Sequence, residues 1–279
     1  MARCLGQVST WPGPAWRGER AGLSSPTHAF NSDGVRIAFI DAAPEGATEP
    51  IVLVHGFAST HAVNWVNTLW VTTLTRADRR VVALDNRGHG ESGKPHDPAA
   101  YHSSLMADDV RRLLDHLGIE RADVMGYSMG ARIAAFLALR HPDRVRSLLL
   151  GGLGSRLVEG EGLPSGIAEA MEAPSIEAVT DPGARGFRAF AEQNRADLKA
   201  LAACIRGSRQ VLSRAEVGSI SLPTLITVGS EDGIAGSAAE LAALMPQAEA
   251  LEIPGRDHNT AVGDRTHKAR VLAFLAERP

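Results

Sequence analysis

Residues 123–132 read DVMGYSMGAR, with Ser128 between Gly126 and Gly130 where an apolar run gives way to a helix-like pattern. A serine that only caps a helix needs no small neighbours, whereas a serine on a tight strand-to-helix turn needs small residues two before and two after it. Such a turn lifts the hydroxyl out of the sheet, and the next amide, that of Met129, faces developing negative charge at a helix N-terminus. The stretch therefore predicts a nucleophilic serine on an elbow formed with both glycines.

Apolar runs alternate with helix-like segments on both sides of this turn. Residues 51–56 and 80–85 are typical of strands buried on both faces, and residues 35–42 alternate like an antiparallel strand. Strands separated by helices predict an α/β fold with a mostly parallel sheet flanked by helices, in which ligands bind beyond the carboxyl ends of the strands. The further expected strands are 122–128, 145–152, 223–229 and 248–255, and the expected helices are 61–74, 105–117, 129–141, 238–244 and 267–277.

Residues 153–218 interrupt this alternation with short helical patches and no strand-like run. We interpret them as a small helical cap over the carboxyl edge of the sheet, inserted into a core of residues 27–152 and 219–279. An ordinary set of surface helices is the alternative. Residues 1–26, rich in Gly, Pro, Ser and Trp, are interpreted as an N-terminal extension.

A serine hydroxyl becomes a strong nucleophile only when a base takes its proton and an acid fixes the tautomer of that base. Of the ten histidines, His258 follows the last predicted strand and is the expected base. Asp232 follows the preceding strand, at the same edge of the sheet, and is the expected acid. Glu231 and Asp257 remain competing candidates for the acid, because one is a neighbour of Asp232 and the other a neighbour of His258.

The oxyanion of an acyl-transfer intermediate needs two hydrogen-bond donors. The amide of Met129 is one expected donor, and the amide of Phe57, in the loop after residues 51–56, is the other. Because neighbouring side chains activate the nucleophile, the sequence implies no metal and no organic cofactor.

The composition argues against several classes of partner. The chain has 279 residues and a formal net charge of −3, from 29 basic and 32 acidic side chains, so neither a nucleic-acid nor a membrane partner is expected. The two cysteines, Cys4 and Cys204, form no disulfide framework or metal cluster, which favours a cytoplasmic location. The oligomeric state stays open, a homo-oligomer included.

Several motifs together resemble the α/β-hydrolase fold family over about residues 27–279. They are HGF at 55–57, DNRGHGESGKP at 85–95, GYSMG at 126–130, GSEDG at 229–233 and GRDHN at 255–259. The resemblance implies that Asp85, Arg87 and His89 organise the loop after their strand.

The resemblance also narrows the reaction. Family members that open epoxides or remove halogens carry aspartate at the elbow, where this chain has Ser128, and its two tyrosines, Tyr101 and Tyr127, lie outside the predicted cap. The prediction is a serine hydrolase for small-molecule carboxylic esters or lactones with small to medium acyl groups. A carbon-carbon bond hydrolase, a perhydrolase or haloperoxidase with the same triad, and a slow-turnover ligand receptor remain open as well.

Overall fold

The structure, a computed structural model, describes residues 25–47, 49–160 and 163–278. Its centre is a sheet of eight strands in the order β1-β2-β4-β3-β5-β6-β7-β8. β2 pairs antiparallel with β1 and with β4, and the other neighbours pair parallel. The prediction of an α/β fold with a mostly parallel sheet is therefore confirmed. The strands are β1 (His28–Ser32), β2 (Val35–Ala42), β3 (Glu49–Val54), β4 (Arg79–Leu84), β5 (Ala122–Tyr127), β6 (Val145–Gly151), β7 (Thr224–Gly229) and β8 (Ala248–Ile253).

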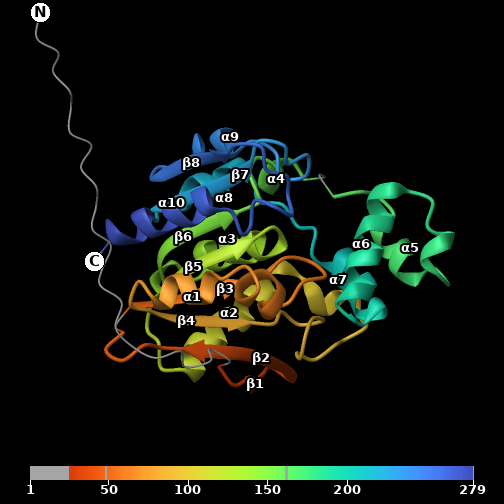
Figure 1. The fold of residues 1–279 in the computed structure, drawn as a ribbon, viewed down its shortest axis with the longest axis horizontal. Helices are drawn as coiled ribbons and strands as arrows, with labels where there is room; N and C mark the ends of the chain where they lie inside the picture. Colours follow the sequence, from red (N-terminus) through yellow and green to blue (C-terminus); the bar gives the residue numbers. More distant parts are fainter. Residues whose placement is uncertain (1–24, 48, 161–162, 279) are drawn as a thin grey trace, which may run out of the picture.

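Helices cover both faces of the sheet (Figure 1). They are α1 (Trp70–Thr75), α2 (Ser103–His116), α3 (Met129–Arg140), α9 (Ala238–Ala242) and α10 (Arg265–Ala276), with short 3₁₀ turns at Pro98–Tyr101, Pro142–Arg144 and Ile176–Ala178. Alternate side chains of β3 point to opposite faces: Val52 and Val54 belong to a buried cluster that includes residues of α2, α3 and α9, whereas Ile51 and Leu53 belong to a second cluster with residues of α1 and α10. Within the described ranges, none of the helices has the length and apolar character required to cross a bilayer.

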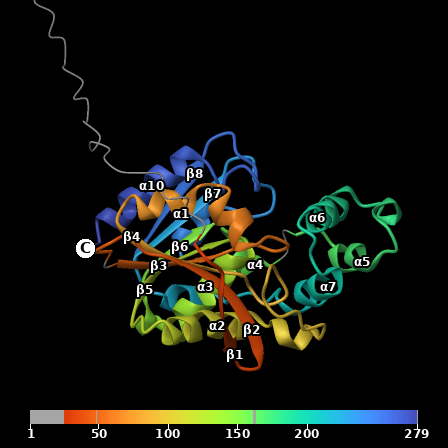
Figure 2. The same ribbon diagram turned by 60° about the horizontal axis from the view of Figure 1, so that its bottom comes forward.

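Between β6 and β7 the described residues form short helices joined by loops, and none of them forms a strand. These helices are α4 (Arg156–Glu159), α5 (Ile167–Glu172), α6 (Pro182–Gln193), α7 (Leu198–Gly207) and α8 (Arg214–Ser219). α5, α6 and α7 form a group at one end of the sheet in both ribbon views (Figures 1 and 2). Asn194, directly after α6, donates a hydrogen bond to the carbonyl oxygen of Ala58 at 3.0 Å, so this group contacts the loop that follows β3. That residues 153–218 act as a cap stays a prediction, as does the division of the core, and residues 1–24 of the predicted extension lie outside the described residues.

The single helix predicted over residues 61–74 is wrong. The chain forms a π-helical turn at Ala62–Val66, Leu69 takes a left-handed conformation with φ 65°, and α1 then begins. Leu69 is 59% exposed, whereas Trp65 and Trp70 are fully buried with ring centroids 6.4 Å apart. Burial of the two indole rings stabilises the folded chain by more than the exposure of one leucine costs. The chain therefore breaks at Leu69 instead of continuing the helix that the spacing of apolar residues suggested.

Strand β1 was not predicted. It forms a hairpin with β2 through Asp33 and Gly34, whose φ angles are 51° and 84°. Two successive residues with positive φ are typical of the two-residue turns that match the twist of antiparallel strands. The Asp-Gly pair is therefore the sequence signal that could have located this hairpin.

Candidate active site

Ser128 lies on a sharp turn between β5 and α3. Its φ of 55° and ψ of −115° are unusual for a residue with a side chain, and its amide donates to the carbonyl oxygen of Gly151 at 2.7 Å. A Cβ atom on Gly126 would lie 2.1 Å from the carbonyl oxygen of Gly130, and one on Gly130 would lie 2.0 Å from that of Val54. Both glycines are therefore required by close backbone packing, which holds the serine in a conformation that costs about 1 to 3 kcal/mol.

The structure brings together the three side chains predicted for the triad. Nε2 of His258 lies 2.9 Å from Oγ of Ser128, and Nδ1 lies 2.7 Å from Oδ2 of Asp232. The other carboxylate oxygen of Asp232 accepts from the amides of Ile234 and Ala235 at 2.9 and 3.0 Å. Since an ionised carboxylate only accepts, the ring proton sits on Nδ1, and Nε2 is left to accept from the serine hydroxyl.

The loops around His258 distinguish the candidate acids. Glu231 is exposed, and its amide donates to the carbonyl oxygen of Arg256. Oδ1 of Asp257 accepts from the amides of Asn259 and Thr260 at 3.0 and 2.8 Å, and from the Thr260 hydroxyl. Asp257 therefore shapes its own loop, and Asp232 is the carboxylate of the three that is hydrogen-bonded to the imidazole.

Tyr127 supports the same loop and was not singled out for this from the sequence. Its hydroxyl donates to the carbonyl oxygen of His258 at 2.6 Å, and the two rings lie 5.5 Å apart. Burial and the nearby Asp232 raise the pKa of Tyr127 well above its ordinary value, which keeps the hydroxyl protonated as a donor. The sequence signal for this supporting role was the position of Tyr127 directly before Ser128 in the motif GYSMG.

The loop after β3 places Phe57 next to Ser128. The amides on either side of Phe57 are held: Gly56 donates to Oδ1 of Asn64 at 2.8 Å, and Ala58 donates to Nε2 of His89 at 3.1 Å. Among the described residues, the amide of Phe57 itself donates to no protein acceptor. Asn64 is a further supporting residue that the sequence did not reveal, because it belongs to the turn that was predicted as helix.

The amide of Met129 opens α3, where first-turn amides have no intrahelical acceptor. Both expected oxyanion donors are thus available near the serine. That Phe57 and Met129 serve this role remains a prediction.

The loop after β4 is buried and internally bonded, in agreement with the structural role expected for Asp85, Arg87 and His89. Asp85 accepts from the amide and the ring of His61 at 2.8 and 2.9 Å, and Arg87 forms two 2.7 Å hydrogen bonds with the carboxylate of Asp109. Burial raises the pKa of Asp85, but the hydrogen bond from His61, the nearby rings of His55 and His61 and the amide of Glu91 together outweigh burial and hold the pKa well below its ordinary value.

A cavity of about 590 Å³ opens beside the catalytic histidine candidate. One wall comes from α6, and Phe187 of this helix lies with its ring centroid 6.0 Å from that of Phe57. The cavity is mainly apolar in its lining, which suits an organic substrate. The lining includes Ser128, His258, Asn259, Val63, Phe190 and Val262.

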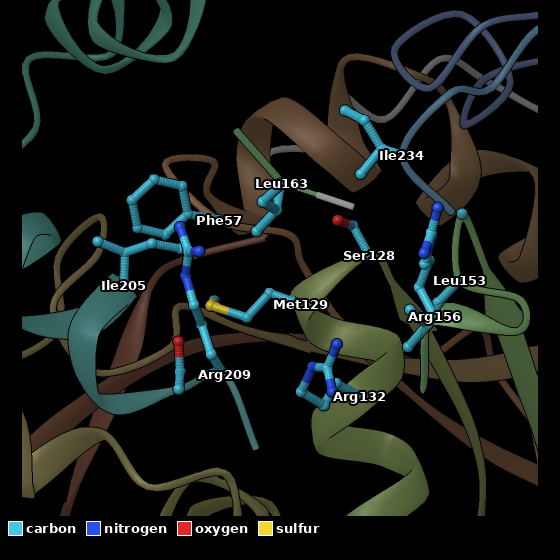
Figure 3. Close-up of a pocket in the computed structure, with 12 residues that line it drawn as sticks. Phe57, Ser128, Met129, Arg132, Leu153, Arg156, Leu163, Ile205, Arg209 and Ile234 are labelled. Carbon is cyan, nitrogen blue, oxygen red and sulfur yellow. The ribbon is translucent and has the colours of Figure 1, made fainter. Parts of the chain in front are cut away.

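A second, smaller cavity of about 50 Å³ meets the first at Ser128, Phe57 and Ile234 (Figure 3). Its lining combines apolar side chains with three arginines, none of which was identified from the sequence. They are Arg132, Arg156 and Arg209. Ser128 therefore lies between two cavities of different size and charge.

Comparison with known proteins identifies the family. The family model described as the alpha/beta hydrolase fold matches residues 49–209, more than half of the 279 residues. The chain belongs to the α/β-hydrolase family. This agrees with the resemblance found in the sequence and with the parallel sheet and elbow of the structure.

Relatives of this α/β-hydrolase carry different names. A 2-hydroxymuconate semialdehyde hydrolase from a Pseudomonas species is 39% identical over 131 residues, which are 47% of this chain and 44% of the relative. The chain thus aligns with less than half the length of that relative. A dihydrolipoyllysine-residue acetyltransferase component of an acetoin cleaving system, from Pseudomonas putida, is 33% identical over 263 residues, covering 87% of this chain and 67% of the relative.

A solved structure described as an N-acyl homoserine lactone degrading enzyme is also similar to this α/β-hydrolase. The two superpose with a TM-score of 0.69 at 26% identity, over 90% of this chain and 99% of the other. The comparisons therefore show a hydrolase family and a shared fold, and they span more than one kind of substrate.

Buried histidines predict that this α/β-hydrolase loses stability on mild acidification. Burial lowers the pKa of His55 and His267 from 6.5 to about 4 and that of His89 to about 3. Between about pH 6.5 and pH 4 the unfolded chain then binds more protons than the folded one. The free energy of unfolding is therefore fully present above this window and falls as the pH drops through it, which the thermal midpoint measured from about pH 8 to about pH 4 would show.

His267 tests the cause of this acid sensitivity. Its Nε2 lies 3.0 Å from the Thr227 hydroxyl in the core. Because asparagine takes up no proton in this pH range, His267→Asn is expected to reduce the slope of the midpoint against pH. His28→Gln, at an exposed side chain of β1, is the matched control and should leave the slope unchanged. A midpoint that stays constant through the window would contradict the prediction.

Proposed function

We propose that this protein is a serine hydrolase that cleaves carboxylic esters or lactones through an acyl-enzyme intermediate. The observation that carries the proposal is the continuous hydrogen-bonded arrangement of Ser128, His258 and Asp232, at 2.9 and 2.7 Å. An arrangement of this kind removes the proton of the serine as its oxygen attacks a carbonyl carbon.

The first half of the proposed reaction forms the acyl-enzyme. Oγ of Ser128 attacks the ester carbonyl while Nε2 of His258 takes the hydroxyl proton. The buried carboxylate of Asp232 stabilises the resulting imidazolium and keeps its orientation. The amides of Phe57 and Met129 donate to the oxyanion, and removing one such donor typically costs about 3 to 4 kcal/mol in activation free energy.

Departure of the alcohol completes the acyl-enzyme, and water then releases the acid. His258 gives its proton to the leaving alcohol, and the bond between the acyl carbon and the alcohol oxygen breaks. Water then attacks the acyl-enzyme, with His258 as base, and the acid leaves while Ser128 regains its proton.

The surroundings of the triad support a small-molecule substrate under a helical cap. The part of the larger cavity wall that comes from residues 153–218 consists of Pro164, Pro182, Gly183, Gly186, Phe187 and Phe190. No side-chain hydroxyl is among these described lining residues, whereas opening an epoxide would require an acid near its ring oxygen. We include in the proposal the cap role of this segment, the ester or lactone substrate and the cytoplasmic location expected from the cysteine content.

Carbon-carbon bond hydrolysis is the second candidate, and the similarity to the 2-hydroxymuconate semialdehyde hydrolase favours it over perhydrolase, haloperoxidase and receptor roles. Asn259 follows His258 and lines the larger cavity, where it would be available to a polar substrate. The same triad could serve this reaction, so substrate tests must decide between ester and carbon-carbon cleavage.

The experiment measures hydrolysis of 4-nitrophenyl esters from acetate to palmitate, together with covalent labelling by a fluorophosphonate followed by intact mass. The small cavity next to the nucleophile leads us to expect kcat/KM to peak at short acyl chains, with one label bound per chain. Labelling of Ser128 without turnover of any ester would move carbon-carbon hydrolysis or a receptor role ahead. Turnover that rises steadily toward palmitate would contradict the small acyl group.

A further inference from the structure

The smaller cavity beside Ser128 collects positive charge. Its three arginines come from separate elements: Arg132 from α3, Arg156 from α4 and Arg209 from the segment after α7 (Figure 3). Resting on the ester hydrolysis proposed above, we propose that this cavity holds the acyl group and that its arginines bind a carboxylate at the far end of that group. The substrate class is then the monoester of a short dicarboxylic acid.

The position of His258 decides which cavity holds the acyl group. Ser128 and Phe57 line both cavities, so the reacting carbonyl lies where the two meet. The lining of the larger cavity includes His258, and that of the smaller cavity does not. Because the histidine must hand its proton to the leaving alcohol, the alcohol occupies the larger cavity. The acyl chain is left to extend into the smaller one.

The arginines of this cavity are not neutralised by the described part of the chain. The one carboxylate that pairs with any of them there is Glu159, whose Oε2 lies 3.4 Å from Nη1 of Arg156. Arg132 and Arg209 donate instead to backbone carbonyl oxygens. The buried Nε of Arg156 has no hydrogen-bond partner among the described residues. The cavity therefore has donors and net positive charge to offer an anion.

Arg132 is the best placed of the three for a short acyl chain. It lies four residues after Ser128 on α3, one helical turn and about 6 Å further along the same side. Burial, together with repulsion from Arg209, lowers its pKa to about 10. A carboxylate between these two guanidinium groups would relieve both effects, and the planar fork of arginine matches carboxylate geometry.

The size of the cavity limits the acyl group. A single water needs roughly 10 to 15 Å³ by the same measure, so about 50 Å³ holds a carboxylate and a few methylene groups. Apolar side chains, including Met129 and Ile205, are available to pack against those methylenes. Hydrolysis breaks the bond between the acyl carbon and the alcohol oxygen, and water supplies the new hydroxyl. The products are a dicarboxylate and a neutral alcohol.

The test compares kcat/KM for the monobenzyl esters of succinic, glutaric and adipic acid with that for neutral benzyl esters of matching acyl length, from the benzyl alcohol released. The wild type is expected to prefer an anionic ester by about 10-fold or more, and Arg132→Met and Arg209→Met should each lower the preference by a similar factor. Arg209 is exposed, so its variant keeps the test valid if loss of the buried Arg132 prevents folding. Arg140→Met is the matched control, because this half-exposed arginine of α3 pairs with Asp108 outside the cavity.

Binding of glutarate to the Ser128→Ala variant, measured by calorimetry, provides a readout that needs no turnover. Equal rates on charged and neutral esters, unaffected by either arginine variant, would overturn the carboxylate site and leave ester hydrolysis standing. If no ester is hydrolysed, the proposed function fails, and the binding of glutarate alone then tests the carboxylate site. Binding that weakens about 10-fold or more with Arg209→Met would support it, and absence of binding would overturn it.

Discussion

Replacing Ser128 with alanine is expected to lower kcat for ester hydrolysis by about 10⁵- to 10⁶-fold while changing KM little. The elbow places the hydroxyl oxygen 2.9 Å from Nε2 of His258, and alanine removes the only atom that can form the acyl-enzyme in this mechanism. The remaining rate would come from water activated by the histidine and from the oxyanion donors. Steady-state kinetics on the best 4-nitrophenyl ester, with protein checked by thermal unfolding, measures the effect.

Ser59 is the matched control for this variant, because it lines the larger cavity and its buried hydroxyl has no hydrogen-bond partner among the described residues. Ser59→Ala is expected to change kcat by less than about 10-fold, because the variant would lose at most one hydrogen bond to a bound substrate. Comparable rates for wild type and Ser128→Ala would show that another group performs the chemistry.

Changing Asp232 to asparagine is expected to lower kcat by about 10⁴-fold. One oxygen of Asp232 accepts from the amides of Ile234 and Ala235, and these contacts would hold the asparagine oxygen in the same place. The amide nitrogen would then face Nδ1 of His258 and donate to it. The ring proton would move to Nε2, where it blocks acceptance of the proton from Ser128.

Kinetics of Glu231→Gln provide the comparison for Asp232. Glu231 was a competing candidate for the acid in the sequence but is exposed in the structure, so its neutralisation should change kcat by less than about 3-fold. A large loss at Glu231 with a small loss at Asp232 would reverse the assignment of the acid.

The placement of the triad could be predicted because each member follows a parallel strand directly. Ser128 follows β5, Asp232 follows β7 within three residues, and His258 follows β8 within five. The carboxyl ends of parallel strands lie at one edge of the sheet, so identifying the strands in the sequence is enough to predict that these three side chains lie close together. The acid partner of His258 could be chosen among Glu231, Asp232 and Asp257 only from the hydrogen bonds of the loops, which residue spacing does not predict.

Other features depend on contacts between distant segments. The break at Leu69 arises because two tryptophans are buried together, although the spacing of apolar residues is helical. Arg132, Arg156 and Arg209 meet at one cavity although 77 positions separate the first from the last, 209 − 132. Each arginine alone is ordinary for a surface, so their convergence is visible only after the helices pack.

The loop that presents Phe57 is attached to the α6 region as well as to the sheet. Asn194 binds the carbonyl oxygen of Ala58, and the rings of Phe57 and Phe187 lie 6.0 Å apart. An exchange of α6 for that of another family member, made to admit a bulkier alcohol, would therefore also shift the amide proposed to stabilise the oxyanion. A change in α6 that alters which alcohols are accepted would thus also alter the rate of turnover. Engineering of substrate selectivity in this protein will have to restore the position of the Phe57 loop as well.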